Sequence, residues 1–300
     1  MPKLESYEEA VFVNSVISEC EDYLGLPIGC TKVTVLGETF PAIFQTDEII
    51  FALKDRIVGI NCGRWDYLFS MIKYLPQNTF PDRKTLSMDQ PYLEAYVNQI
   101  VGTCHQRGIH AMGGMSANIP SKVESENAAI VEKIMADKAL EIARGCDGAW
   151  VAHPALIEPV QKLFEEKLAG ANDQKHVSAA LPSNEAFFPT KVEGPFSEEC
   201  MADNLAVATA YTQAWLGGSG AVAINNLMED LATAEISCAQ IRNWVDQGVV
   251  PRDKVVFTGD ASTNKILEKY VDSKEPFLYA AAFQQMEGVL GPKGRCMTQK

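Results

Sequence analysis

Short apolar runs alternate with longer stretches of helical periodicity in the first half of the chain, and this alternation limits the folds open to it. Four runs have the length of buried strands, at residues 32–36, 57–61, 109–112 and 149–152. Apolar residues at helical spacing mark residues 40–56, 67–75, 92–106 and 128–144. Strands that alternate with helices form parallel β-α-β units, so an α/β barrel or open sheet is predicted.

The composition changes after residue 167. Residues 168–196 are rich in Ala, Asn, Ser and Pro, which predicts a linker. Long helical segments follow at residues 198–215 and 232–245, and glycines at positions 217, 218 and 220 mark a tight connection between them. The predicted organisation is an α/β domain at residues 1–167, the linker, and a helical domain at residues 197–300.

The number of strands leaves two architectures open. An eight-stranded barrel needs eight strand–helix units. Four strands are clear before the linker, and residues 1–5 have the pattern of the end of another. The first domain is therefore either a smaller open sheet or part of a barrel.

Charge and composition exclude several classes of partner. The formal net charge is -13, so the surface repels nucleic-acid phosphates and anionic lipid. No stretch approaches the roughly 20 apolar residues that span a bilayer. The eight cysteines are scattered without a C-x-x-C pair, which favours reduced thiols over structural zinc. The N-terminus lacks a signal-peptide pattern, so a cytosolic location is expected.

Two carboxylates follow predicted strands directly. Glu38 comes after the first strand and Asp66 after the second, and in a parallel α/β fold both lie where sites form. Two carboxylates without nearby His or Cys suit a hard cation, Mg²⁺ before Zn²⁺. The alternative is that each carboxylate caps the helix that follows it.

Other strand ends carry residues suited to ligand contact. Gly63 and Arg64 follow the second strand, where backbone N–H groups and a cation can meet a small anion. The glycine pair at residues 113–114 stands between Met112 and Met115 and permits either close ligand approach or a tight turn. Trp150 and Pro154 flank the end of the fourth strand, and Asp230 precedes a helical run as a base or a cap.

Taken in order, six segments closely resemble the malate synthase family, in its shorter A-type form. They are PKLES at residues 2–6, VTVLGET at 33–39, GINCGRWDY at 59–67, TCHQRGIHAMGGM at 103–115, GAWVAHPAL at 148–156 and NLMEDLATAEIS at 226–237. The resemblance implies a (β/α)₈ TIM barrel, partial in this chain, followed by an α-helical C-terminal plug. It also implies condensation of acetyl-CoA with glyoxylate and hydrolysis of the thioester to malate, in the glyoxylate cycle.

The resemblance assigns roles to the residues singled out above. Glu38 and Asp66 correspond to the Mg²⁺ ligands, and Asp230 corresponds to the base that removes a methyl proton from acetyl-CoA. The backbone of Gly63, Arg64, Trp65 and Asp66 corresponds to a seat for glyoxylate. Four further residues correspond to parts of a channel for the CoA arm: Met112, Met115, Trp150 and Pro154.

Some features depart from the family pattern. The family places an arginine for the developing enolate on a strand before the PKLES motif, and Gly37 stands where a bulky apolar residue is usual. We therefore expect impaired turnover and self-association through an incomplete barrel. Two alternatives remain open: a degenerate malate-synthase-like remnant, or another Mg²⁺-dependent carbon–carbon lyase for CoA thioesters. A peroxisomal or glyoxysomal location is the alternative to the cytosol, although no C-terminal targeting tripeptide is seen.

Overall fold

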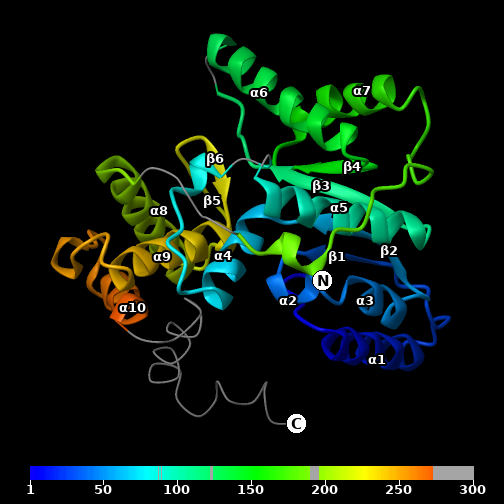
Figure 1. Cartoon of the computed structure of the whole chain (residues 1–300), viewed down its shortest axis with the longest axis horizontal. Helices are drawn as coiled ribbons and strands as arrows, with labels where there is room; N and C mark the ends of the chain where they lie inside the picture. Colours follow the sequence, from blue (N-terminus) through cyan, green and yellow to red (C-terminus); the bar gives the residue numbers. More distant parts are fainter. Residues whose placement is uncertain (87, 89, 122–123, 190–195, 273–300) are drawn as a thin grey trace. The chain divides into compact units, whose positions relative to one another are not determined.

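The computed structural model describes residues 1–86, 88, 90–121, 124–189 and 196–272. These residues form two compact units (Figure 1). The first takes the described residues of Met1–Ser70, Leu86–Lys191 and Asn226–Met228. The second takes those of Met71–Thr85, Val192–Asn225 and Glu229–Lys300. In the part of the chain that the structure describes, no helix is long and apolar enough to cross a membrane.

A four-stranded parallel sheet is the centre of the first unit. It consists of β1 (Val33–Gly37), β2 (Ile57–Cys62), β3 (His110–Ser116) and β4 (Gly148–Val151) in the order β1-β2-β3-β4. Each strand adds beside the one before it, as Figure 1 shows, whereas doubly wound sheets reverse their order. The α/β prediction is confirmed, and the progression is that of part of a barrel.

Helices precede, connect and follow these strands. They are α1 (Tyr7–Tyr23), α2 (Phe40–Ile43), α3 (Thr46–Ala52), α4 (Arg64–Tyr74), α5 (Pro91–Gln106), α6 (Glu124–Ala143) and α7 (Ile157–Lys167), with 3-10 helices η1 (Arg83–Thr85), η2 (Pro154–Leu156) and η3 (Asn184–Phe187). The prediction of one helix over residues 40–56 is wrong. Gln45 has φ -121° and ψ 21°, outside the helical region, and separates α2 from α3.

The core of the first unit explains the unusual glycine at the end of β1. Ile60 of β2 and Ile100 of α5 are both buried against this strand. A Cβ on Gly37 would lie 2.7 Å from Ile60 Cγ2 and 3.1 Å from Ile100 Cδ1. A bulky residue cannot fit here unless these isoleucines move, so the departure from the family pattern is matched by the local packing.

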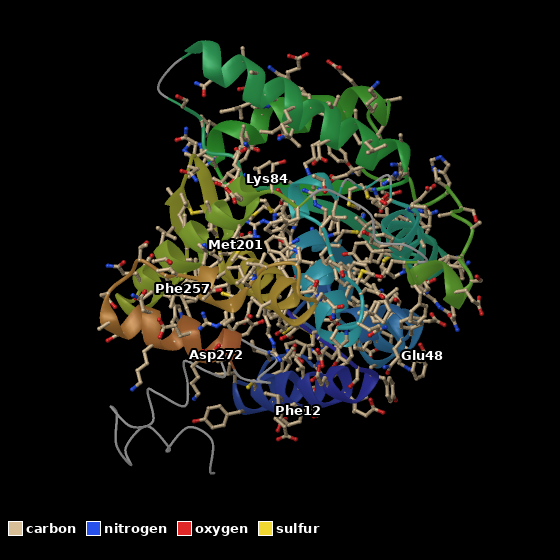
Figure 2. The ribbon with its side chains drawn as sticks, turned by 60° about the vertical axis from the view of Figure 1, so that its left-hand side comes forward. Phe12, Glu48, Lys84, Met201, Phe257 and Asp272 are labelled. Atoms are coloured by element: carbon tan, nitrogen blue, oxygen red, sulfur yellow. The ribbon has the colours of Figure 1, made fainter. Side chains whose placement is uncertain are left out.

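The second unit is helical. It contains α8 (Glu198–Leu216), α9 (Leu231–Asp246), α10 (Ala261–Asp272), the short strand β5 (Val222–Ile224), and the 3-10 helices η1 and η4 (Arg252–Lys254). The short strand β6 (Leu227–Glu229) pairs with β5, and its first two residues are assigned to the first unit. Its core surrounds the fully buried Trp244 and includes Met201 and Phe257, labelled in Figure 2. Asn225 and Asn226 have φ of 51° and 60°, the left-handed pair that a two-residue hairpin turn requires.

The predicted linker at residues 168–196 contains η3, whose aromatic neighbourhood anchors it. The Phe187 ring lies 5.2 Å from the Phe44 ring, and the Phe188 ring lies 5.4 Å from the Phe40 ring. Residues 190–195 of the linker lie outside the described residues. The domain boundaries at 167 and 197 stay a prediction, because Met71–Thr85 also packs within the second unit.

Candidate functional site

Glu38 and Asp66 lie together at one edge of the parallel sheet. Glu38 follows β1 directly, and Asp66 lies in the first turn of α4, just beyond β2. The last residues of the two strands, Gly37 and Cys62, are register partners, so the two chains leave the sheet side by side. Glu38 is 3% exposed and Asp66 is 9% exposed. Two carboxylates are therefore held close together with little water around them.

Lys3 supplies positive charge beside this buried pair. Burial and the nearby charge of Asp66 together raise the pKa of Glu38 to about 8, while Lys3 opposes the rise. The Lys3 ammonium contacts Asp66 Oδ1, and the Lys3 backbone N–H donates to Glu38 Oε1 at 2.8 Å. Thr39 is the N-cap of α2, so the Glu38 carboxylate does not cap that helix.

Tyr96 joins the two loops that carry the carboxylates. Its hydroxyl accepts a hydrogen bond from the Gly63 N–H at 2.9 Å and donates to the Gly37 carbonyl at 2.5 Å. A Cβ on Gly63 would lie 2.5 Å from Glu38 Oε2, so only glycine allows the Glu38 carboxylate to pack there. The Gly63 N–H that the sequence offers to a ligand is thus engaged by Tyr96 in this structure.

The glycine pair of β3 faces a buried ion pair. Gly113 and Gly114 lie inside β3 rather than after it. Lys138 of α6 is fully buried and donates to Glu141 Oε1 at 2.9 Å and to the Gly114 carbonyl at 2.6 Å. A Cβ on Gly113 would lie 1.9 Å from Glu141 Oε2. The glycines therefore accommodate Glu141, rather than a ligand or a tight turn.

Arg64 and Trp65 begin α4 beside Asp66. The Arg64 guanidinium lies 4.2 Å from the centre of the Trp65 ring, a stacked cation–π arrangement. Burial lowers the pKa of Arg64, and the carboxylates of Asp137 and Glu141 oppose this shift. The arginine is thus a partly buried cation near the end of β2.

The four residues predicted for the CoA arm lie on β3, β4 and the turn beyond. Met115 and Trp150 are register partners on neighbouring strands and are 41% and 38% exposed. Met112 packs against Gly148, where a Cβ would lie 2.9 Å from its Cε. Pro154 is exposed at the start of η2. The structure brings Met115 and Trp150 together as an exposed apolar pair.

Asp230 belongs to the second unit and begins α9. Its Oδ1 accepts a hydrogen bond from the Ala232 N–H at 2.9 Å. Asp230 is therefore the N-cap of α9, one of the two roles that the sequence leaves open for it. Its side chain is exposed, whereas the adjacent Glu229 is buried. The segment Asn226–Met228, just before it, belongs to the first unit, where the Met228 N–H donates to the Ala117 carbonyl at 2.7 Å.

The donor set at the sheet edge fits a hard cation. Among the described residues, no cluster of three or more His, Cys, Asp and Glu side chains could hold a metal ion. Glu38 and Asp66 supply carboxylate oxygens there, which suits Mg²⁺, a cation that usually keeps water or substrate oxygens beside one or two carboxylates. Lys3 opposes the rise in the pKa of Glu38 that burial and Asp66 cause, so positive charge favours the ionised pair.

Two residues of the site carry no sequence signal for their role. Lys3 falls in a matched motif, but nothing in that motif pairs it with Asp66. Tyr96 stands on the apolar face of a helix, where an aromatic residue predicts only core packing. Both connect segments far apart in sequence, and one sequence does not show such contacts.

Known protein families match almost the whole chain. Residues 1–186 match the family model described as the malate synthase TIM barrel domain, and residues 196–296 match the one described as malate synthase C-terminal. Malate synthase A of Escherichia coli (strain K12) is 46% identical over 252 residues, 82% of this chain and 47% of that protein. Malate synthase of Myxococcus xanthus (strain DK1622) is 44% identical over 264 residues, 86% of this chain and 49% of that protein.

The chain spans about half the length of the curated relatives it matches. A solved Haloferax volcanii malate synthase, described as a lead(II) complex, is 14% identical with a TM-score of 0.49, covering 84% of this chain and 62% of that one. Proteins named glyoxysomal malate synthase, from Candida tropicalis and Gossypium hirsutum, are 41% and 42% identical.

Proposed function

The chain belongs to the malate synthase family, and we propose that it carries the chemistry of that family: condensation of acetyl-CoA with glyoxylate, then hydrolysis to malate and free CoA. One observation carries the proposal. Glu38 and Asp66 meet at the ends of adjacent parallel strands, in the family's barrel domain, as a buried pair stabilised by positive charge.

Glu38 and Asp66 are the residues that would hold Mg²⁺. When bound, the cation polarises the aldehyde of glyoxylate as a Lewis acid. The first turn of α4, with Gly63 before it and Arg64, Trp65 and Asp66 in it, supports a seat for the glyoxylate carboxylate. The partly buried Arg64 cation and the helix N-terminus both favour an anion there.

Asp230 is the proposed base. Its carboxylate takes one methyl proton of acetyl-CoA, and the resulting carbon attacks the glyoxylate aldehyde carbon. Water then cleaves the thioester, which releases the CoA thiol. Exposure of Asp230 beside the buried Glu229 suits this role, because an accessible carboxylate can reach substrate while it still caps α9.

Met115 and Trp150 are proposed to guide the CoA arm, with Met112 and Pro154 nearby along the chain. Their support is the exposed apolar pair across β3 and β4, which a pantetheine chain can cover. The cytosolic location expected from the sequence stays a prediction, since the matched relatives include proteins named glyoxysomal.

Proton exchange tests the proposed base. We expect the chain, complemented by the part of a relative that it does not span, to exchange acetyl-CoA methyl protons in deuterated water and to release thiol with glyoxylate and Mg²⁺. Asp230→Asn keeps the cap but removes basicity, so both signals should disappear. The matched control is Asp260→Asn at the start of α10, where Asp260 Oδ1 accepts from the Thr263 N–H at 2.8 Å. Exchange at the wild-type rate in Asp230→Asn would show that another group removes the proton.

A further inference from the structure

A segment from between the second and third strands runs along α9 in the second unit. The Phe80 N–H donates to Asn243 Oδ1 at 3.0 Å, and its carbonyl accepts from Trp244 Nε1 at 2.6 Å. The Pro81 carbonyl accepts from Gln240 Nε2 at 2.5 Å. Residues 80–83, here called the 80–83 segment, are therefore fixed to α9 through backbone groups, over more than 150 positions of sequence.

Arg83 ends this segment inside the second unit. It is 6% exposed, and its Nη1 donates to Asn204 Oδ1 of α8 at 2.6 Å and to Ser237 Oγ of α9 at 2.5 Å. Ser237 Oγ donates in turn to the Thr233 carbonyl at 2.7 Å, one turn nearer the start of α9. One buried guanidinium thus joins α8 to the first two turns of α9.

The same cation acts on the residue before Asp230. Glu229 is buried, and its Oε2 accepts from Thr233 Oγ1 at 2.5 Å. Burial raises the pKa of Glu229, while the Thr233 hydroxyl and the Arg83 charge oppose this rise and the Asp230 charge adds to it. Arg83 therefore stabilises a buried carboxylate directly beside the proposed base.

We propose that Arg83 is a positioning residue for the segment Glu229–Asp230. Its guanidinium ties the start of α9 to α8 and balances the charge of Glu229, so that Asp230 is held as the cap of α9 beside an ionised neighbour. The proposal rests on the proposed function only for the chemical role of Asp230. The positioning itself depends on contacts inside the second unit.

Loss of Arg83 has two separate consequences. Without the guanidinium, Asn204 and Ser237 lose a shared partner, and the first turns of α9 loosen. Without the positive charge, Glu229 is a buried carboxylate beside another carboxylate, and it takes up a proton at higher pH than before. Arg83→Lys keeps the charge without the planar fork, and Arg83→Met removes both.

Carboxyl titration and amide exchange test the positioning without any need for turnover. In Arg83→Met, the ¹³C-detected titration midpoint of Glu229 should rise by about one unit or more. The Ala232 amide, which Asp230 caps, should exchange at least tenfold faster. Arg83→Lys should keep the Glu229 midpoint. The double variant Arg83→Met, Glu229→Gln removes the uncompensated charge and should recover most of the Ala232 protection.

Asn204→Ala is the matched control, because it removes one neutral partner of Arg83 and leaves the charge in place. It should leave the Glu229 midpoint unchanged. In the complemented chain, Arg83→Met should lower kcat for methyl-proton exchange more than it changes KM for acetyl-CoA. If the complemented wild-type chain does not exchange acetyl-CoA methyl protons, the proposed function is wrong. The titration of Glu229 still tests the positioning role of Arg83 in that case. An unchanged Glu229 midpoint in Arg83→Met, or an equal shift in Asn204→Ala, would overturn the positioning role of Arg83.

Discussion

Lys3 contacts both carboxylates that are proposed to bind Mg²⁺. The Lys3 ammonium contacts Asp66, and its backbone N–H donates to Glu38. We predict that Lys3→Met, which removes the ammonium and keeps the length of the side chain, binds Mg²⁺ more tightly than the wild type. The reason is that the two carboxylates then lose the Lys3 ammonium, which partly neutralises them.

Titration calorimetry with Mg²⁺ measures this effect. Lys162→Met is the control. Lys162 forms an exposed ion pair with Glu158 on α7 at 2.6 Å, so this substitution removes the same charge at a site far from the two carboxylates in sequence. An equal change in both variants would assign the effect to net charge. Weaker binding in Lys3→Met would mean that Lys3 supports the metal and does not compete with it.

Sequence position alone predicts which carboxylates lie at the sheet edge, because chains leave neighbouring parallel strands at the same end. Glu38 directly follows β1, and Asp66 lies in the first turn of α4, the helix that follows β2. Both are at the same end of the sheet, because the last residues of the two strands are register partners. The contacts that fix them come from Lys3, at the start of the chain, and Tyr96, on α5. Neither contact follows from a local pattern, since each joins residues more than thirty positions apart.

The packing of α6 on β3 makes its own prediction. Gly113→Ala places a Cβ against Glu141 Oε2, and that carboxylate cannot move away without loss of its contacts with Lys138 and the Gly114 N–H. We expect a loss of about 1–3 kcal/mol in the free energy of unfolding, measured by urea denaturation.

Gly114→Ala is the matched control. Its Cβ would lie 3.3 Å from the Cys62 carbonyl and 3.7 Å from Glu141 Oε1, so only a small adjustment is needed. We expect a change within about 1 kcal/mol. Equal stability of the two variants would show that Glu141 does not require a glycine at position 113.

At the scale of elements, the sequence predicts the strands well and the peripheral helices poorly. The four predicted strands are β1 to β4, because short apolar runs between helical segments have few other interpretations. The helix α1 is not predicted, since Val11, Phe12 and Val16 are exposed and its buried residues are Ala10 and Glu21. It is held instead by a buried ion pair, Arg56 Nη1 to Glu21 Oε1 at 3.0 Å, which leaves no apolar stripe to recognise.

Helices α7 and α10 are also missing from the prediction, for a different reason. In α10 the buried residues Ile266, Leu267, Tyr270 and Val271 do have helical spacing. The apolar pattern of α10 is therefore present in the sequence, but it is too short to stand out among the neighbouring turn residues. Residues 71–85 belong to the second unit because of long-range contacts such as those of Arg83, and a single sequence does not reveal such contacts.

At the scale of the whole molecule, the described sheet has four strands, whereas the family's TIM barrel closes with eight. Among the described residues, no strand pairs with the outer edge of β4. We therefore predict that the 300-residue chain alone self-associates and turns over little, because an open sheet admits water to the site and leaves a strand edge free.

Complementation tests this prediction. A separately expressed polypeptide with the part of the Escherichia coli relative that the chain does not span should restore thiol release in part and reduce self-association in sedimentation velocity. Full turnover and a monomeric chain without any added polypeptide would contradict the prediction.

The central claim is that Glu38 and Asp66 together form a magnesium site, and calorimetry of Mg²⁺ binding tests it most directly. The double variant Glu38→Gln, Asp66→Asn should lose the Mg²⁺ binding seen in the wild type. The control double variant Glu158→Gln, Asp47→Asn removes two carboxylates from exposed ion pairs and should keep it. If the Glu38→Gln, Asp66→Asn protein binds Mg²⁺ with wild-type affinity, the site proposed at the ends of β1 and β2 is wrong.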